Sequence, residues 1–115
     1  MNYERTLLID EHFISPDEQI LYIFGTGVDA ETAYKKTEKK AVAFIDNYRY
    51  GEGFKFYGKP IISFDTYMDS RTKHDLIIIA TYRFSREISE QLNRAGLIAG
   101  KDYYIKSIPA KSINF

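Results

Sequence analysis

The feature that most limits what this chain can fold into is a glycine turn between a strand and a helix. Ile20-Leu21-Tyr22-Ile23-Phe24 is an apolar run rich in β-forming residues, as in strands buried in parallel sheets. Gly25-Thr26-Gly27 follows directly, and apolar residues then recur at helical spacing, which predicts a helix over residues 28–38. With Ala30 in that helix, the turn reads G-x-G-x-x-A.

An acidic residue completes this pattern. Ala41-Val42-Ala43-Phe44-Ile45 is expected to form a second strand, and Asp46 ends it about 20 residues after the turn. In Rossmann-type βαβ units the glycines allow a sharp turn and close approach of the backbone to a phosphate, and the acid accepts hydrogen bonds from ribose hydroxyls. The sequence therefore predicts such a unit, with nucleotide-binding residues Gly25, Thr26, Gly27 and Asp46.

Apolar strands and amphipathic helices alternate along the remaining chain. Further strands are expected at 60–62, 76–80 and 103–105. One helix is expected from an N-cap at Ser63 to Met68, and another from an N-cap at Ser85 to a C-terminal Gly96. This order predicts an α/β fold: a Rossmann-like open parallel sheet of four to five strands, order 3-2-1-4-5, with helices on both faces.

Length and composition narrow the class of protein. A chain of 115 residues is one domain, and we expect a leader over residues 1–19 and a Rossmann-like nucleotide-binding domain over residues 20–115. The absence of cysteine fits a reducing cytoplasm. Equal numbers of basic and acidic residues, 16 each, argue against nucleic acid, and the apolar runs are too short to enter a membrane. The sequence shows no catalytic acid/base pair or nucleophile motif, so an enzyme is the less favoured reading.

Two more groups of candidate residues follow strand ends. Thr81, Tyr82 and Arg83 come after the fourth expected strand, at the edge where parallel sheets bind ligands. There Arg83 can pair with a phosphate and Tyr82 can stack on a base or sugar, or both can be ordinary surface residues. Asn47 follows Asp46 and leads into an aromatic loop, residues 48–57, which can cover a base. Arg49 in that loop can neutralise a ribose phosphate. That loop can equally be a hairpin whose aromatic side chains cover the sheet or a partner subunit.

One residue opposes a phosphate site at the glycine turn. Asp29 lies in the first turn of the predicted helix, where the free N–H groups otherwise attract anions. Its carboxylate can repel a pyrophosphate or take its place. The alternative hypothesis is therefore a protein-interaction or assembly domain that keeps a vestigial ligand site, with a homodimer or a docked partner covering its aromatic loop.

Short motifs along the chain resemble a known bacterial domain. They are Phe24-Gly25-Thr26-Gly27, Phe44-Ile45-Asp46 and Gly58-Lys59-Pro60-Ile61-Ile62, followed by the apolar run at 76–80. This pattern is similar to the small Rossmann-like domain at the N-terminus of sugar O-acyltransferases and of polysaccharide-biosynthesis nucleotide-sugar dehydratases. The resemblance implies a nucleotide-sugar or NAD-like nucleotide at Gly25, Gly27 and Asp46, and a catalytic partner. Hexapeptide repeats and a dehydratase half do not follow, so the resemblance implies an accessory protein or part of a larger enzyme.

Overall fold

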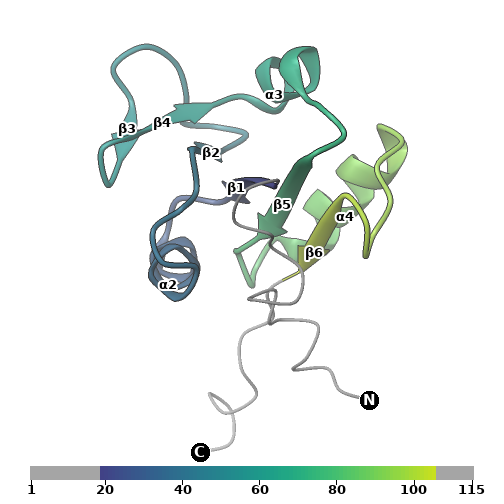
Figure 1. The fold of residues 1–115 in the computed structure, drawn as a ribbon, viewed down its shortest axis with the longest axis horizontal. Helices are drawn as coiled ribbons and strands as arrows, with labels where there is room; N and C mark the ends of the chain where they lie inside the picture. Colours follow the sequence, from purple (N-terminus) through teal and green to yellow (C-terminus); the bar gives the residue numbers. More distant parts are fainter. Residues whose placement is uncertain (1–18, 106–115) are drawn as a thin grey trace, which may run out of the picture.

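Strands and helices alternate through residues 19–105, the part of the chain that this computed structural model describes (Figure 1). The elements are β1 (Ile20–Phe24), α2 (Val28–Lys36), β2 (Ala43–Ile45), β3 (Lys55–Phe56), β4 (Lys59–Ile62), α3 (Phe64–Ser70), β5 (Asp75–Ile79), α4 (Ser85–Arg94) and β6 (Tyr103–Ile105). The expected leader, apart from its last residue, lies outside the described residues, as does the end of the expected domain after residue 105.

The strands form one six-stranded sheet in the order β3-β4-β2-β1-β5-β6. Five of them, from β4 to β6, pair in parallel, and β3 pairs with β4 antiparallel. The sheet is thus larger than the predicted four to five strands, and its order differs from 3-2-1-4-5 because β3 adds an edge strand. A tight turn makes this addition: Tyr57 and Gly58 have φ of 54° and 77°, the left-handed backbone that two-residue hairpins need.

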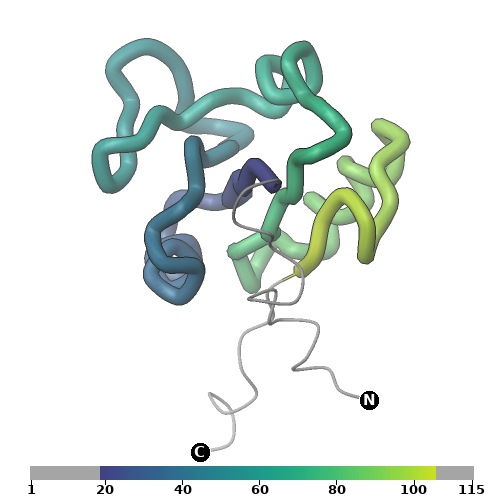
Figure 2. The backbone as a smooth tube through the Cα atoms, in the orientation of Figure 1, coloured from purple at the N-terminus to yellow at the C-terminus, as the bar shows by residue number. Residues whose placement is uncertain are grey.

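Helices cover both faces of the sheet, as predicted. On one face α2 packs on the sheet through Ala30, Ala33 and Tyr34. On the other face α3 and α4 form a second apolar cluster with the sheet, through Phe64, Tyr67, Ile88 and Leu92. Figure 2 follows the chain from the β3–β4 hairpin through α3 into β5, the segment that carries it from one half of the sheet to the other.

Strand β5 contributes to both clusters. Leu76 and Ile78 belong to the α2 side, and Ile77 and Ile79 to the α3 and α4 side. The three consecutive isoleucines are 0%, 3% and 0% exposed. A central parallel strand is covered on both faces, which is why its sequence is continuously apolar rather than alternating.

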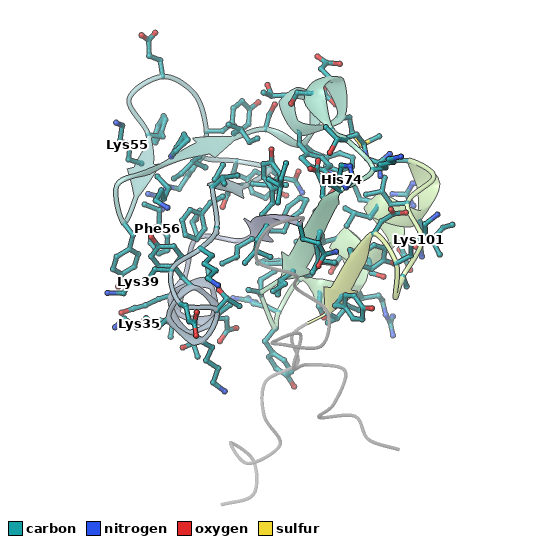
Figure 3. The ribbon with its side chains drawn as sticks, viewed as in Figure 1. Lys35, Lys39, Lys55, Phe56, His74 and Lys101 are labelled. Carbon is teal, nitrogen blue, oxygen red and sulfur yellow. The ribbon has the colours of Figure 1, made fainter. Side chains whose placement is uncertain are left out.

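The aromatic hairpin is divided between core and surface. Phe56 packs edge-to-face on Phe44, with ring centroids 4.9 Å apart, and in Figure 3 it lies on the side of the hairpin that faces α2. Tyr57 stacks on Tyr34 of α2 at 5.4 Å. Tyr57 is nevertheless exposed, as are Tyr48, Tyr50 and Phe54. The prediction of a hairpin whose aromatic side chains cover the sheet therefore holds for Phe56, whereas Tyr57 lies on α2.

Local backbone chemistry moves several predicted boundaries. Helix α2 ends at Lys36 rather than residue 38, because Glu38 and Lys39 take φ of 60° and 59°, which no helix tolerates. Ser63 caps α3 as expected, accepting a bond of 3.0 Å from the backbone N–H of Thr66. Ser85 does not cap α4: it is the first helical residue, and its hydroxyl bonds the carbonyl of Tyr82 instead. Among the described residues no helix is long and apolar enough to cross a membrane.

We expect Ile78→Ala to lower the free energy of unfolding by about 2–5 kcal/mol, because it leaves a cavity under α2 at the centre of the sheet. Urea titration followed by circular dichroism measures this loss. A loss below about 1 kcal/mol would place β5 at the periphery of the core, against its burial on both faces.

Tyr67 carries an unusual buried polar group. Its side chain is fully buried and packs edge-to-face on Tyr22, with ring centroids 4.8 Å apart. Its hydroxyl makes no hydrogen bond within the described structure. Burial raises the pKa of Tyr67 to about 12; the nearby Arg71 opposes this increase and the charge of Asp75 adds to it. The folded state therefore favours the neutral phenol.

We expect Tyr67→Phe to keep the free energy of unfolding at pH 7 within about 1 kcal/mol of wild type, since it removes a hydroxyl that folding desolvates without a partner. Tyr67 ionises near pH 10 in the unfolded chain and only near pH 12 in the folded one, so the fold keeps its full stability below pH 10 and loses stability as the pH rises towards 12. Urea titrations from pH 8 to 11 should thus show a shallower alkaline loss for the variant. Parallel profiles for the two proteins would contradict this assignment.

Candidate functional site

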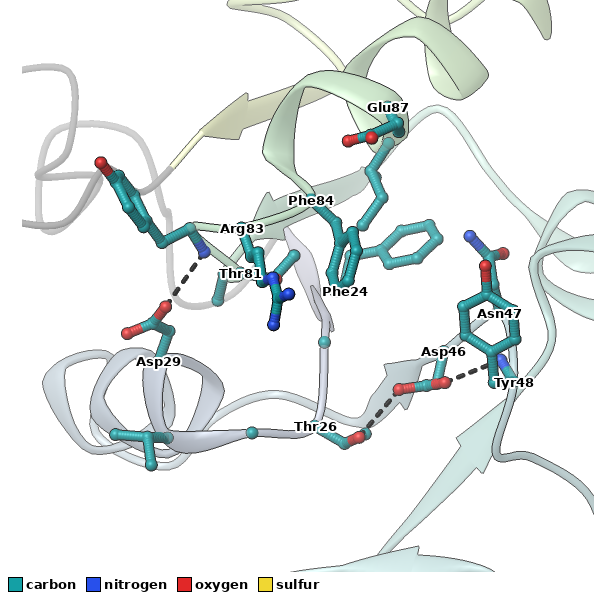
Figure 4. Close-up of a pocket in the computed structure, with 16 residues that line it drawn as sticks. Phe24, Thr26, Asp29, Asp46, Asn47, Tyr48, Thr81, Arg83, Phe84 and Glu87 are labelled. Carbon is teal, nitrogen blue, oxygen red and sulfur yellow. Dashed lines mark hydrogen bonds between the residues drawn. The ribbon is translucent and has the colours of Figure 1, made fainter.

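A pocket of about 880 Å³ opens at the carboxyl ends of β1, β2 and β5 (Figure 4). Its position follows from the topology: β1 leads into α2 on one face of the sheet, whereas β5 leads into α4 on the other. The segments after β1 and β5 therefore diverge and leave a crevice between them, the place where open α/β sheets bind ligands. The residues that line it are Phe24, Gly25, Thr26, Gly27, Val28, Asp29, Asp46, Asn47, Tyr48, Ala80, Thr81, Tyr82, Arg83, Phe84, Glu87 and Ile88.

The two glycines of the turn have different roles. Gly25 has φ of 129°, and a Cβ there would lie 2.8 Å from the carbonyl oxygen of Ala80, so only glycine fits between β1 and β5. Gly27 has φ of −104°, which any residue adopts, and a Cβ there would meet nothing within 4 Å. Gly25 is therefore needed for packing, and Gly27 leaves open space beside the first turn of α2.

Gly27 is also the N-cap of α2 and offers no side chain to its free N–H groups. The first backbone bond of the helix runs from Glu31 to the carbonyl of Gly27 at 3.0 Å. The N–H groups of residues 28–30 precede this bond, and such groups attract anions. This end of the pocket thus supplies backbone donors.

Asp46 joins two walls of the pocket. One of its carboxylate oxygens accepts bonds from the backbone N–H groups of Tyr48 and Arg49, at 2.8 and 2.9 Å. The other oxygen accepts the hydroxyl of Thr26 at 2.8 Å. Three internal donors use most of the hydrogen-bond accepting capacity of the carboxylate. Asp46 therefore mainly connects the glycine turn to the loop after β2.

Asn47 and Gln91 form a second connection between segments that surround the pocket. Their side-chain amides exchange two hydrogen bonds, of 2.9 and 3.1 Å, and connect the loop after β2 to α4. This pair closes the pocket at the side opposite α2. Asn47 lines the pocket, as its place beside Asp46 suggested, but its amide is directed to Gln91 rather than left for a ligand.

Asp29 does not lie across the helix terminus. Its carboxylate accepts the backbone N–H of Tyr82 at 3.0 Å and so fixes the start of α2 to the loop after β5 (Figure 4). Asp29, which was expected to oppose a phosphate site, therefore forms a third connection of this kind. Its negative charge remains on the rim of the pocket and also favours α2 through the helix dipole.

Two charged side chains of the pocket have no such bond. Arg83 packs over the ring of Phe84, 5.5 Å from its centroid, and within residues 19–105 its guanidinium makes no ion pair or hydrogen bond. Glu87, in the first turn of α4, is likewise without a partner among the described residues. Of the described residues that line the pocket, Arg83 is the only cation, against the carboxylates of Asp29, Asp46 and Glu87.

All of the predicted site residues except Arg49 come together around this pocket. Gly25, Thr26, Gly27, Asp46, Asn47, Thr81, Tyr82 and Arg83 line it, whereas only the backbone N–H of Arg49 takes part, as a donor to Asp46. Phe84, Glu87 and Ile88 at the start of α4 also line the pocket and were not among the predicted site residues. Their position shortly after the fourth expected strand, on the same edge as Arg83, is the sequence feature that indicates them.

The pocket has the chemistry of a binding site. Its walls are apolar and aromatic, and polar groups from the turn, Arg83 and Glu87 converge on one space. Among the described residues no group of three or more metal-ligating side chains could hold a metal ion.

Residues 17–101 match the family model described as C2185-like, N-terminal. The matched region includes every residue that lines the pocket. No curated protein matches the chain.

We expect Gly25→Ala to lower the free energy of unfolding by about 2 kcal/mol or more, because its Cβ meets the backbone of Ala80 and its φ is positive. Gly27→Ala is the matched control, with an expected loss below about 1 kcal/mol from the poorer N-cap. Urea titration of both variants gives the comparison. Equal losses would show that the close approach of β1 and β5 does not require glycine.

Proposed function

We propose that this chain, which belongs to the C2185-like N-terminal family, is a nucleotide or nucleotide-sugar binding module that serves bacterial surface-polysaccharide biosynthesis. The observation that carries the proposal is the open space at Gly27. Gly27 has a backbone conformation that any residue can adopt, yet it has no side chain beside the free N–H groups of α2. This leaves room there for an anionic group of a ligand.

The arrangement of polar groups supports the same proposal. Backbone donors of residues 28–30 and the unpaired guanidinium of Arg83 approach the pocket from its two principal walls, and a phosphate between them would satisfy both. Aromatic rings of Tyr48, Tyr82 and Phe84 lie around the same space and are suited to stack on a base or sugar. Asp46 acts mainly by holding Thr26 and the following loop in place.

The proposal assigns catalysis to another protein or domain. The binding module would present its ligand to a catalytic partner, or act as a homodimer, in the cytoplasm. The resemblance to the N-terminal domains of sugar O-acyltransferases and nucleotide-sugar dehydratases supports this division of labour.

A second candidate function is supported by the exposed side chains around the pocket. Val28, Tyr48 and Tyr82 are 76%, 85% and 66% exposed, and Phe84 is about half exposed. Large exposed apolar side chains that gather in one region mark interaction sites as well as ligand sites. An assembly domain with a vestigial ligand site would use this rim to contact a partner protein.

A ligand screen separates the two functions. We expect the melting temperature of the full chain to rise with a nucleotide or nucleotide-sugar at millimolar concentration, because a ligand that binds only the native state stabilises it. The screen uses AMP, UMP, their diphosphates, UDP-glucose and NAD, with coenzyme A as a further nucleotide. No shift with any of them, and no heat in calorimetry, would favour the assembly domain.

Gly27→Asp tests where the ligand binds. Aspartate is a good N-cap, so the unliganded variant should melt close to wild type, yet its carboxylate occupies the space beside the α2 donors. We expect nucleotide binding to weaken by about tenfold or more, as loss of a bond to a charged group implies. Unchanged affinity would place the ligand away from the glycine turn.

A further inference from the structure

The acidic side chains that line the pocket differ in whether they accept hydrogen bonds. Asp29 and Asp46 accept hydrogen bonds from backbone N–H groups, which partly compensate their charge. Glu87 has no such donor among the described residues, and it extends from the α4 wall of the pocket, whereas Asp46 lies across from it on the β2 side (Figure 4). Within the described part of the pocket, Glu87 is thus the one carboxylate that accepts no hydrogen bond.

Few positive groups line the described part of the pocket. Among the described lining residues Arg83 is the single cation, and the N-termini of α2 and α4 add fractional positive charges. Asp29 and Glu31 in the first turn of α2 reduce the contribution of that helix, and Glu87 in the first turn of α4 reduces the other. A second phosphate would add negative charge to a pocket whose described side chains already carry three carboxylates against one guanidinium.

We infer that Glu87 determines the ligand class of this pocket by excluding a second phosphate. The pocket then takes a nucleoside monophosphate, free or joined through its phosphate to a sugar, in preference to a pyrophosphate. Arg83, oriented by the ring of Phe84, binds the phosphate, and the α4 wall around Glu87 receives the uncharged part of the ligand. This inference depends on the proposed function and narrows it.

Paired nucleotides test the inference in calorimetry on the full chain. The probes are AMP with ADP and UMP with UDP, at low ionic strength, where screening is weakest. We expect wild type to bind the monophosphate of the preferred base about tenfold more tightly than its diphosphate. Glu87→Gln keeps the shape of the side chain and removes its charge, and it should reduce that preference to about threefold or less, mainly through tighter diphosphate binding.

Glu90→Gln is the matched control. It lies on the same helix, makes the same change of charge and does not line the pocket, so the preference should stay as in wild type. A wild-type preference for the diphosphate, an unchanged preference in Glu87→Gln, or an equal change in both variants would overturn the role of Glu87 while nucleotide binding itself stands. Failure of wild type to bind any of the four nucleotides would overturn this inference, and silence towards UDP-glucose, NAD and coenzyme A as well would overturn the proposed function.

Discussion

The contact between β1 and β5 is the interaction on which the other features of this domain depend. The two strands pair in parallel over their whole length, and at their carboxyl ends the backbone of Gly25 lies against that of Ala80. Every residue of β5 is buried, and its side chains enter the clusters on both faces of the sheet. Because the chain leaves β1 towards one face and β5 towards the other, this contact also forms the floor of the pocket.

Side-chain hydrogen bonds then build the pocket on that floor. Asp46 connects the glycine turn to the loop after β2, Asp29 connects α2 to the loop after β5, and Asn47 connects the β2 loop to Gln91 on α4. Judged by their place after β2 alone, Asp46 and Asn47 would be ligand contacts, and Asp29 would oppose a phosphate at the glycine turn. In the folded chain they are largely satisfied internally, which leaves backbone N–H groups, Arg83 and Glu87 to face a ligand.

The match to the C2185-like N-terminal family runs from before β1 to beyond α4. It therefore includes the pocket and five of the six strands of the sheet, and it ends before β6. Exposed aromatic side chains at the rim give the same surface a capacity for contact with another protein. Under the proposed function, ligand binding and partner contact would both take place at this edge of the sheet.

The sequence by itself determined the α/β class, the parallel strands, the burial of Ile77 to Ile79 and the Ser63 cap, because these follow from periodicity and local backbone chemistry. It also identified most residues of the pocket, since strand ends meet at one edge of a parallel sheet. Only the tertiary structure added β3, whose two residues are too short to give a pattern and form a strand by pairing with β4. Only the tertiary structure directed Asp29 and Asn47 to partners 53 and 44 residues away. Such long-range bonds depend on how elements pack, and no local pattern of residues encodes them.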